Sequence, residues 1–216
     1  MHSRARSEEA KLRRAEDLLA AARSLAAELG GVRHITLAAV TQAAGLHPSA
    51  VRRYFASKEE LLLELAERGW QEWRDALTAY LAAARHLTPP ETAAAVATTL
   101  AGLPLLCDLL THVPLSLEGE VDLERARRYK TNAFAAYDTI IDTLATTGTM
   151  TPSQLHDLVA TALGVTANLW QLAHPTPTLA RLYAQETRWA HAALDFEPRL
   201  TRLLQATATG LTTPQP

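Results

Sequence analysis

Two arginines, a lysine and an aromatic pair occur close together in one segment, HPSAVRRYFASKEELL, which covers residues 47–62. Arg52 and Arg53 are adjacent, an aromatic pair follows them, and Lys58 comes shortly afterwards. The planar guanidinium group of arginine can grip a phosphate or pair with the O6 and N7 atoms of guanine. The segment therefore predicts either a surface that contacts nucleic acid or the solvated face of an ordinary helix.

The charge of the chain is unevenly distributed. Residues 1–58 contain ten Lys or Arg and five Asp or Glu, whereas the rest of the chain contains eleven and eighteen. The first part therefore carries +5 and the remainder −7, which together give the net charge of −2. A basic segment joined to an acidic one is typical of a nucleic-acid-binding module attached to another domain. Short basic N-termini are also common, so charge alone leaves both interpretations open.

The elements that position these residues are expected to be helices. Hydrophobic residues make up 48% of the chain, which is enough for a packed core. Alanine and leucine dominate over β-branched and aromatic residues, and these two lose least on entering a helix. No alternation of apolar and polar residues is long enough to propose a strand. The sequence therefore predicts an all-α protein without internal repeats.

The first expected helix has a clear amphipathic pattern. Its apolar residues recur at steps of three and four, which is typical of one buried helical face. Ser7 is the expected N-cap, and Gly30 with Gly31 ends the helix. The residues of the expected buried face are Leu12, Ala15, Leu19, Ala22, Ala26 and Leu29.

Two short helices are expected next, on either side of a glycine turn. Thr36 can cap the helix LAAVTQAA, and Gly45 marks a tight turn after it. Pro48 stands at the first position of a third helix, where its missing N–H costs nothing. Val51 and Phe55 then face inward at a spacing of four. A helix, a glycine turn and a second helix are the pattern of a helix-turn-helix.

Capping signals divide the rest of the chain into further helices. Ser57 and Glu60 form an expected capping box for a helix that extends to about residue 80. Thr88, Thr151 and Thr176 are the expected N-caps of later helices. Helices are expected at residues 93–110, 121–147 and 152–174, then from Pro177, with a last short helix near Pro198. A loop is expected at residues 111–120. One face of the helix at 121–147 is expected to carry Phe134, Tyr137, Ile141 and Leu144.

Several kinds of site and segment are not expected. Cys107 is the only cysteine, so the chain cannot form an internal disulfide or a multi-cysteine zinc site. The N-terminus has charges throughout and no apolar central region of a secretion signal. The most apolar segment, residues 92–110, contains Pro104 and Asp108 and is better interpreted as a core helix than as a membrane span. We therefore expect no metal, no cofactor, no membrane partner and a cytoplasmic location.

Residues 35–65, ITLAAVTQAAGLHPSAVRRYFASKEELLLEL, resemble the N-terminal DNA-binding domain of the TetR family of bacterial transcriptional regulators. The features that agree are Thr36 as a cap, the turn Ala44-Gly45-Leu46, the RRYF run and the SKEEL start of the following helix. The spacing of six elements agrees at once, which makes the resemblance specific over about 30 residues. Beyond residue 80 only helix lengths and chain length agree.

The resemblance implies a division of the chain and a set of DNA contacts. It implies a helix-turn-helix domain at residues 1–56, a ligand-binding and dimerisation domain at residues 57–210 joined to it by a long helix, and a disordered tail at residues 211–216. Arg52 stands where the family usually has a tyrosine, and His47 stands where it often has Ser or Thr. The implied phosphate contacts are Thr36, His47, Tyr54 and Lys58, and the implied base contacts are Pro48, Ser49 and one or both of Arg52 and Arg53.

The resemblance also implies a small-molecule site and a homodimer in the second part of the chain. Polar and aromatic residues on otherwise apolar helices are the candidates for the site, although each could equally be core. The helix from residue 155 to 170 has more apolar positions than one buried stripe needs, which fits either a dimer interface or a central helix. The pocket candidates are Trp70, Trp73, Cys107, His112, Tyr137, Asn168 and Trp170, and the interface candidates are Leu155, Val159, Leu163 and Trp170.

The leading hypothesis is a dimeric repressor that binds a palindromic double-stranded DNA operator, is released by a small, apolar effector, and is associated with the bacterial nucleoid. The first alternative is an all-α interaction protein that no longer reads DNA, given the missing tyrosine. The second is an α-helical enzyme. No HExxH-type metal motif and no glycine-rich phosphate loop occur in the sequence, which argues against the enzyme.

Overall fold

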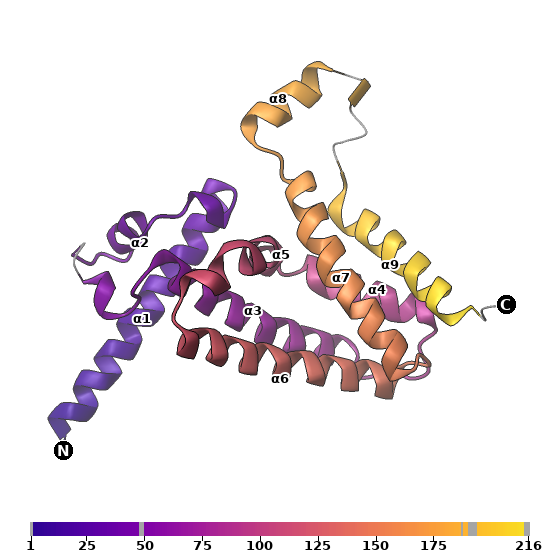
Figure 1. Ribbon diagram of the computed structural model, residues 1–216, viewed down its shortest axis with the longest axis horizontal. Helices are drawn as coiled ribbons and strands as arrows, with labels where there is room; N and C mark the ends of the chain where they lie inside the picture. Colours follow the sequence, from indigo (N-terminus) through magenta and orange to yellow (C-terminus); the bar gives the residue numbers. More distant parts are fainter. Residues whose placement is uncertain (1, 48–49, 187, 190–193, 214–216) are drawn as a thin grey trace.

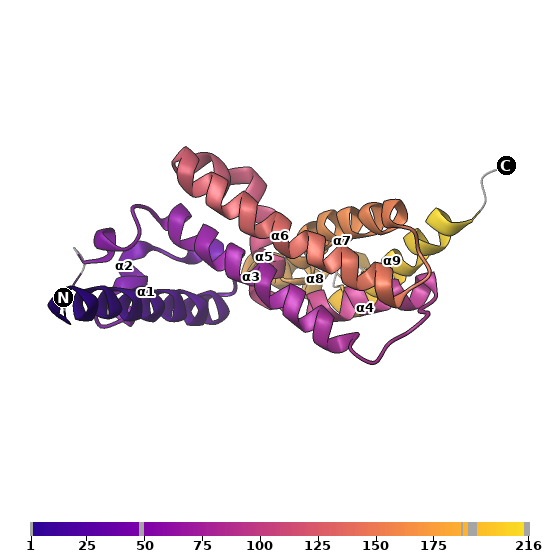
Figure 2. The same ribbon diagram turned by 90° about the horizontal axis from the view of Figure 1, so that it is seen from below.

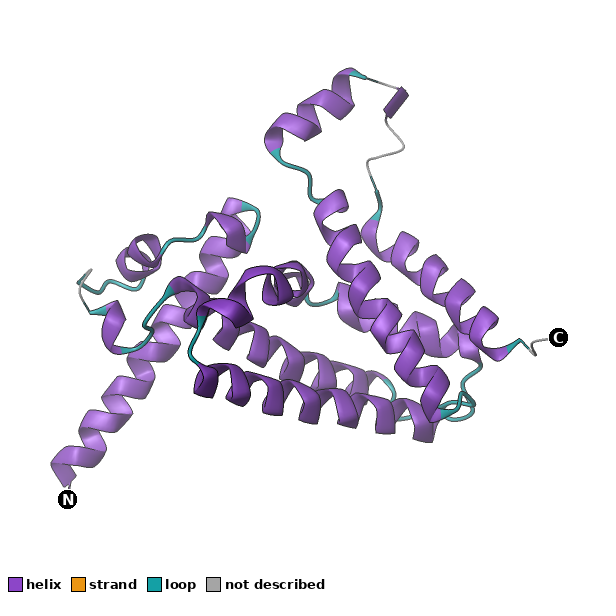
Figure 3. Cartoon of the chain, in the orientation of Figure 1, coloured by secondary structure: helices purple, strands orange, loops and turns teal. Residues whose placement is uncertain are grey.

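The computed structural model describes residues 2–47, 50–186, 188–189 and 194–213 of the chain. Within these residues the secondary structure is helical, with nine α-helices and no strand (Figure 3). The predicted all-α class is therefore confirmed. The structure is elongated, with α1 and α2 at one end and the C-terminus at the other (Figure 1).

The head of the molecule, residues 2–56, contains α1 (His2–Leu29), η1 (Val32–His34), α2 (Leu37–Ala43) and η2 (Val51–Arg53). Helix α1 begins upstream of Ser7, so the prediction that Ser7 is its N-cap is wrong. Leu12 and Leu29 are 66% and 45% exposed, so the buried face is shorter than its periodicity predicted. It comprises Leu18, Leu19, Ala22 and Ala26.

Helix α3 (Lys58–Tyr80) extends from the head into the remainder of the chain, which we call the body (Figure 2). Its N-cap is Ser57, whose hydroxyl accepts a hydrogen bond from the amide of Glu60 at 3.1 Å. The Glu60 carboxylate accepts from the amide of Ala56 at 2.5 Å, one residue before the position that a capping box uses. Buried leucines and tryptophans along α3 make the core continuous from head to body.

The single helix expected at residues 93–110 is broken into two helices, α4 (Pro89–Ala101) and α5 (Pro104–His112). The break follows from Pro104, which cannot donate a backbone hydrogen bond and restricts Leu103 before it to non-helical angles. The segment 111–120, expected to be a loop, is also helical. A π-helical turn, η3 (Val113–Leu117), and a 3₁₀ turn, η4 (Glu118–Glu120), extend α5.

Helix α6 (Leu123–Thr147) runs beside α3 and in the same direction, because Glu67 meets Arg125 at one point and Trp70 meets Tyr129 further along. Its N-cap is Asp122, whose carboxylate accepts from the amide of Arg125 at 2.7 Å. The predicted apolar face of this helix is only partly buried. Ile141 and Leu144 are buried as expected, whereas Phe134 is 59% exposed.

Three helices complete the body: α7 (Pro152–Ala173), α8 (Pro177–Gln185) and α9 (Phe196–Thr212). The predicted N-caps Thr151 and Thr176 are confirmed by bonds from the amides of Gln154 and Leu179, both at 3.4 Å. Helix α9 packs against α4 and α7. It begins near Pro198 as predicted, but at 17 residues it is not the short helix that was expected. Because α9 extends to Thr212, residues 211–212 belong to it and not to a tail.

Among the described residues no single helix is long and apolar enough to cross a membrane. One bent pair, Pro89–Ala101 with Pro104–Glu120, reaches the required length and composition, but its halves meet at 90°.

Candidate functional site

The predicted reading surface lies on α2 and η2, at the end of the molecule opposite to the C-terminus (Figure 1). Thr36 is the N-cap of α2, because its hydroxyl accepts from the amide of Ala39 at 3.1 Å. Gly45 has a φ of +66° in the turn after α2, a backbone conformation that favours glycine. The start of the predicted helix-turn-helix is therefore present.

The two arginines of the surface are presented by η2. Val51 and Phe55 are buried in the head core, as the spacing predicted, and they fix this turn. Arg52 and Arg53 are exposed on its outer side. In the part of this segment that the structure describes, the expected recognition helix is a single 3₁₀ turn. The predicted contacts Pro48 and Ser49 lie outside the described residues.

The remaining predicted DNA contacts have different environments. His47 is exposed, whereas Tyr54 is half-buried and packs against the head core. Lys58 is half-buried, and its ammonium group donates to the carbonyl of Arg33 at 3.2 Å. A phosphate contact from Lys58 would therefore share or replace this bond.

Ion pairs connect the head to the body along α3. Arg68 on α3 donates two hydrogen bonds of 2.6 Å to the carboxylate of Glu16 on α1. This pairing lowers the pKa of Glu16 below its ordinary value. Glu64, one turn away, accepts from Arg68 at 3.4 Å and from Arg125 at 3.2 Å. A second exposed pair, Arg23 with Glu72, links α1 to α3 again.

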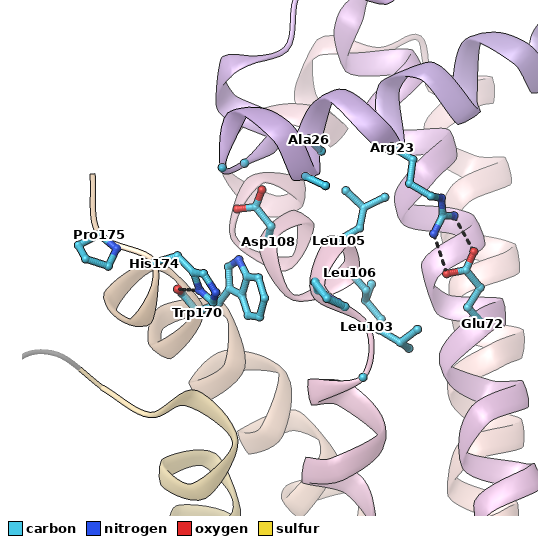
Figure 4. A pocket seen from close by; sticks show the side chains of 15 residues that line it. Arg23, Ala26, Glu72, Leu103, Leu105, Leu106, Asp108, Trp170, His174 and Pro175 are labelled. Atoms are coloured by element: carbon cyan, nitrogen blue, oxygen red, sulfur yellow. Dashed lines mark hydrogen bonds and ion pairs between the residues drawn. The ribbon is translucent and has the colours of Figure 1, made fainter. Parts of the chain in front are cut away.

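A cavity of about 720 Å³ lies between the head and the body (Figure 4). The end of α1, the turn between α4 and α5, and the end of α7 form its walls. Asp108 on α5 reaches across the junction, and its carboxylate accepts from the amide of Val32 in η1 at 2.7 Å. The other carboxylate oxygen accepts from Gln171 on α7 at 2.8 Å. A single buried side chain thus joins three segments.

Of the seven predicted pocket residues, only Trp170 lines this cavity. Trp70 and Trp73 are buried between α3 and its neighbours, where their indole N–H groups donate to Tyr129 and Thr99, both at 3.1 Å. These satisfied hydrogen bonds make them core residues, which was the alternative at the sequence level. The other four are placed as follows: Cys107 is fully buried, His112 and Tyr137 are half-buried, and Asn168 is exposed.

The predicted dimer interface requires a correction. Leu155 and Val159 are completely buried within their own subunit, so their side chains cannot form an exposed face for a partner. Leu163 and Trp170 are half-buried, and Trp170 stacks on His174 with ring centroids 3.8 Å apart. The apolar excess on α7 is explained by its position beside α9, α5, α6 and α4.

The chemistry of Cys107 is that of a structural thiol. Its sulfur donates to the carbonyl of Leu100 at 3.1 Å, and burial raises the pKa of Cys107 to about 12. A thiol that remains protonated is a poor nucleophile. In the described ranges, no three His, Cys, Asp or Glu side chains are grouped so that they could hold a metal ion.

Comparison with known protein families gives two matches that together cover most of the chain. Residues 18–65 match the family described as bacterial regulatory proteins, tetR family. Residues 67–215 match the tetracyclin repressor-like C-terminal domain. A comparison with curated proteins finds no significant match. The two matches identify the chain as a DNA-binding transcriptional regulator with a helix-turn-helix head, and the chain belongs to the TetR family.

The residues that join the head to the body were not among the predicted functional residues. Asp108 is the only charged residue in the run LPLLCDLL, and an isolated carboxylate in an apolar helix was a usable signal for a buried polar contact. Arg68 and Glu16 gave no such signal, because charged residues on amphipathic helices are usually solvated.

Proposed function

We propose that this protein is a repressor that binds a palindromic DNA operator as a homodimer and is released by a small-molecule effector. The observation that carries the proposal is the exposed pair Arg52 and Arg53 on η2. The buried side chains of Val51 and Phe55 fix this turn on the head. Such a bacterial regulator would act in the cytoplasm, at the nucleoid. The proposed contact residues remain Thr36, His47, Pro48, Ser49, Arg52, Arg53, Tyr54 and Lys58.

The DNA contacts divide into two kinds. Charged and hydroxyl groups at the edge of the surface would contact phosphates and fix its position. Arg52 and Arg53, at its centre, can pair with base edges in the major groove. The half-burial of Tyr54 favours a role in which its ring supports the turn and only its hydroxyl reaches a phosphate.

The homodimer is proposed to form through the outer faces of α7 and α9, which lie side by side. Small or apolar side chains are exposed on both helices, among them Ala160 and Gly164 on α7 and Leu203 and Ala206 on α9. A Cβ added at Gly164 would meet nothing within 4 Å, so a partner helix can approach closely there. A homodimer carries two heads, and a two-fold operator presents its half-sites in successive major grooves about 34 Å apart.

The test of DNA binding uses duplexes selected by the immobilised protein from a randomised pool. We expect fluorescence anisotropy to show tight binding to selected duplexes. The affinity should fall by about a thousandfold or more between roughly 50 and 200 mM salt, because phosphate contacts release counterions. Selected sites should be palindromic. Recovery of no preferred sequence, or an affinity that salt does not change, would overturn the proposal.

The dimer is tested by Gly164→Arg and Leu203→Glu, with the exposed Arg127→Ala on α6 as the matched control. Analytical ultracentrifugation should give a dimer for the parent and the control. Both interface variants should shift toward monomer and lose affinity for the selected duplex. A dimer that persists in both variants would place the interface elsewhere.

A further inference from the structure

The cavity between the head and the body has the properties of a ligand site. Its volume of about 720 Å³ lies within the range of small-molecule pockets. Most of its wall is apolar, with Leu103, Leu105 and Leu106 at the start of α5 and the indole of Trp170 on α7 (Figure 4). Two carboxylates, Glu72 and Asp108, are the acidic groups in this wall.

The two carboxylates differ in how their charge is balanced. Glu72 is paired with Arg23 through hydrogen bonds of 2.6 and 3.2 Å, so this pair is close to neutral. Asp108 is 6% exposed and receives its hydrogen bonds from two neutral donors, a backbone amide and the Gln171 amide. In the part of the chain that the structure describes, no Lys or Arg forms an ion pair with Asp108.

One titratable side chain, that of His112, lies beside Asp108 and would balance its negative charge if it were protonated. The Nε2 atom of His112 lies 3.8 Å from its carboxylate. Burial, the largest influence, lowers the pKa of His112; the Asp108 carboxylate raises it, and Lys58 and Arg33 lower it, so that the net shift is downward. The neutral imidazole is therefore favoured, and His112 adds no positive charge beside the Asp108 carboxylate. A buried charge without an opposite charge is costly, so a cationic occupant would be stabilised there.

We propose that this cavity binds an organic cation with an apolar body and that Asp108 receives the positive group. This inference rests on the proposed function, because it names the effector class of the same regulator. The leucines of α5 and the Trp170 indole would cover the apolar body, and the aromatic face adds attraction for a cation.

The position of Asp108 connects ligand binding to the orientation of the head. Its carboxylate oxygen that holds the Val32 amide also lies 3.2 Å from the place where a Cβ on Gly31 would be. The head and α5 are thus in close contact at this point. A cation that draws the carboxylate into the cavity weakens the bond to Val32. The ligand therefore has different affinities for two states of the protein, one in which Asp108 holds the Val32 amide of the head and one in which this bond is broken. A switch requires such a difference.

Ligand binding is tested by isothermal titration calorimetry on the full chain with three compounds that share one ring system: naphthylmethylamine, naphthalenemethanol and naphthoate. We expect the protonated amine to bind about tenfold or more tightly than the alcohol, and the carboxylate to bind most weakly. Equal affinity for the amine and the alcohol would overturn the assignment of Asp108 as the charge receptor.

Three variants locate the site. Asp108→Asn should remove the preference for the amine over the alcohol and leave the alcohol affinity within about twofold. Ala27→Phe should fill the cavity from the exposed side of α1 and abolish binding of both compounds. Because Ala27 is exposed, this variant should fold even where the Asp108 change does not. Asp142→Asn, which changes an exposed carboxylate on α6, is the matched control and should behave like the parent. Unchanged binding in Ala27→Phe would place the ligand elsewhere.

The effect on DNA is measured separately, so that the two proposals can fail independently. With a duplex selected from a randomised pool, saturating naphthylmethylamine should weaken DNA affinity about tenfold or more, and naphthoate should not. Amide hydrogen exchange at Val32 should accelerate with the amine. If the amine binds in the cavity and neither quantity changes, the link to the head is overturned. If no duplex is selected, the DNA proposal fails, whereas the calorimetry still decides the ligand site.

Discussion

The guanidinium group of Arg125 on α6 and the carboxylate of Glu67 on α3 form an ion pair at 2.8 Å in which both side chains are more than nine-tenths buried. Arg125 also reaches Glu64 at 3.2 Å, and Asn132 donates to Glu67. These bonds replace much of the water that the two charges lost on folding, although the buried Nε atom of Arg125 has no hydrogen-bond partner among the described residues. The pair therefore holds α3 against α6 only as long as both partners remain.

We expect Arg125→Ala to lower the free energy of unfolding by about 3 kcal/mol, because it removes the nearest cation from the buried Glu67 carboxylate and leaves only the more distant, exposed Arg128 at 3.7 Å. The double variant Arg125→Leu with Glu67→Leu should lose less than the single one, since no lone charge remains. Arg127→Ala, an exposed residue on the same helix, should change stability by less than about 0.5 kcal/mol. Urea unfolding at one fixed protein concentration gives all three values. A double variant less stable than the single would contradict the argument.

Arg52 and Arg53 provide the test of sequence reading. At least one of Arg52→Ala and Arg53→Ala should weaken binding to the selected duplex by about 1–3 kcal/mol and reduce the preference for that sequence. Arg52→Lys separates the two roles, because lysine keeps the charge and loses the planar fork. Retained preference in Arg52→Lys would indicate a phosphate contact. Anisotropy with selected and unrelated duplexes measures the sequence preference of each variant. If both alanine variants kept the preference of the parent, neither arginine would contact a base.

Gly30 and Gly31 provide a matched pair at the junction after α1. Gly30 has a φ of +72° and open space around a Cβ, so Gly30→Ala should cost only the backbone strain of about 1–2 kcal/mol. Gly31 has a φ of +138°, and its Cβ would also press on Asp108. Gly31→Ala should therefore cost more and should accelerate amide exchange at Val32. Thermal unfolding of both variants tests this, and equal losses would show that the contact with Asp108 is unimportant.

Stability should fall at alkaline pH because two buried groups, the thiol of Cys107 and the hydroxyl of Tyr129, resist ionisation in the folded protein. Burial raises the pKa of Cys107 from 9.0 to about 12 and, with other influences, that of Tyr129 from 10.0 to about 12. Both groups ionise first in the unfolded state, so the stability present below pH 9 is lost as the pH rises from 9 toward 12. The slope should be at most about 1.4 kcal/mol per pH unit for each group. Cys107→Ala should flatten the curve of urea midpoint against pH above pH 9, and an unchanged curve would contradict the thiol contribution.

The helix starts could be predicted from the sequence because capping is local. Thr36, Ser57 and Thr151 each bond an amide three residues later, a contact that depends on neighbouring positions alone. Ser7 fulfilled the same pattern but was wrong, because nothing in the preceding residues stops the helix. Pro104 is also a local signal for a helix break, but the apolar residues on both sides of it favour one continuous helix.

The cavity could not be predicted, since its walls come from segments far apart in the chain. Periodicity identifies which residues are apolar on a helix, but not which neighbour covers them. Trp73 and Trp170 looked alike in sequence, yet the first is fully buried and the second borders the cavity. Asp108 joins Val32 and Gln171 only once three helices have packed.

Helix α8 stands apart from the other helices, and none of its residues is buried. Leu179 and Leu182 on its surface are 40% and 36% exposed, so its removal from the body would uncover little apolar area. Its opening therefore costs far less free energy than opening of the core. We therefore expect a protease to cut the native chain within this segment more readily than within the core helices, and a reporter domain to be tolerated here better than in the core.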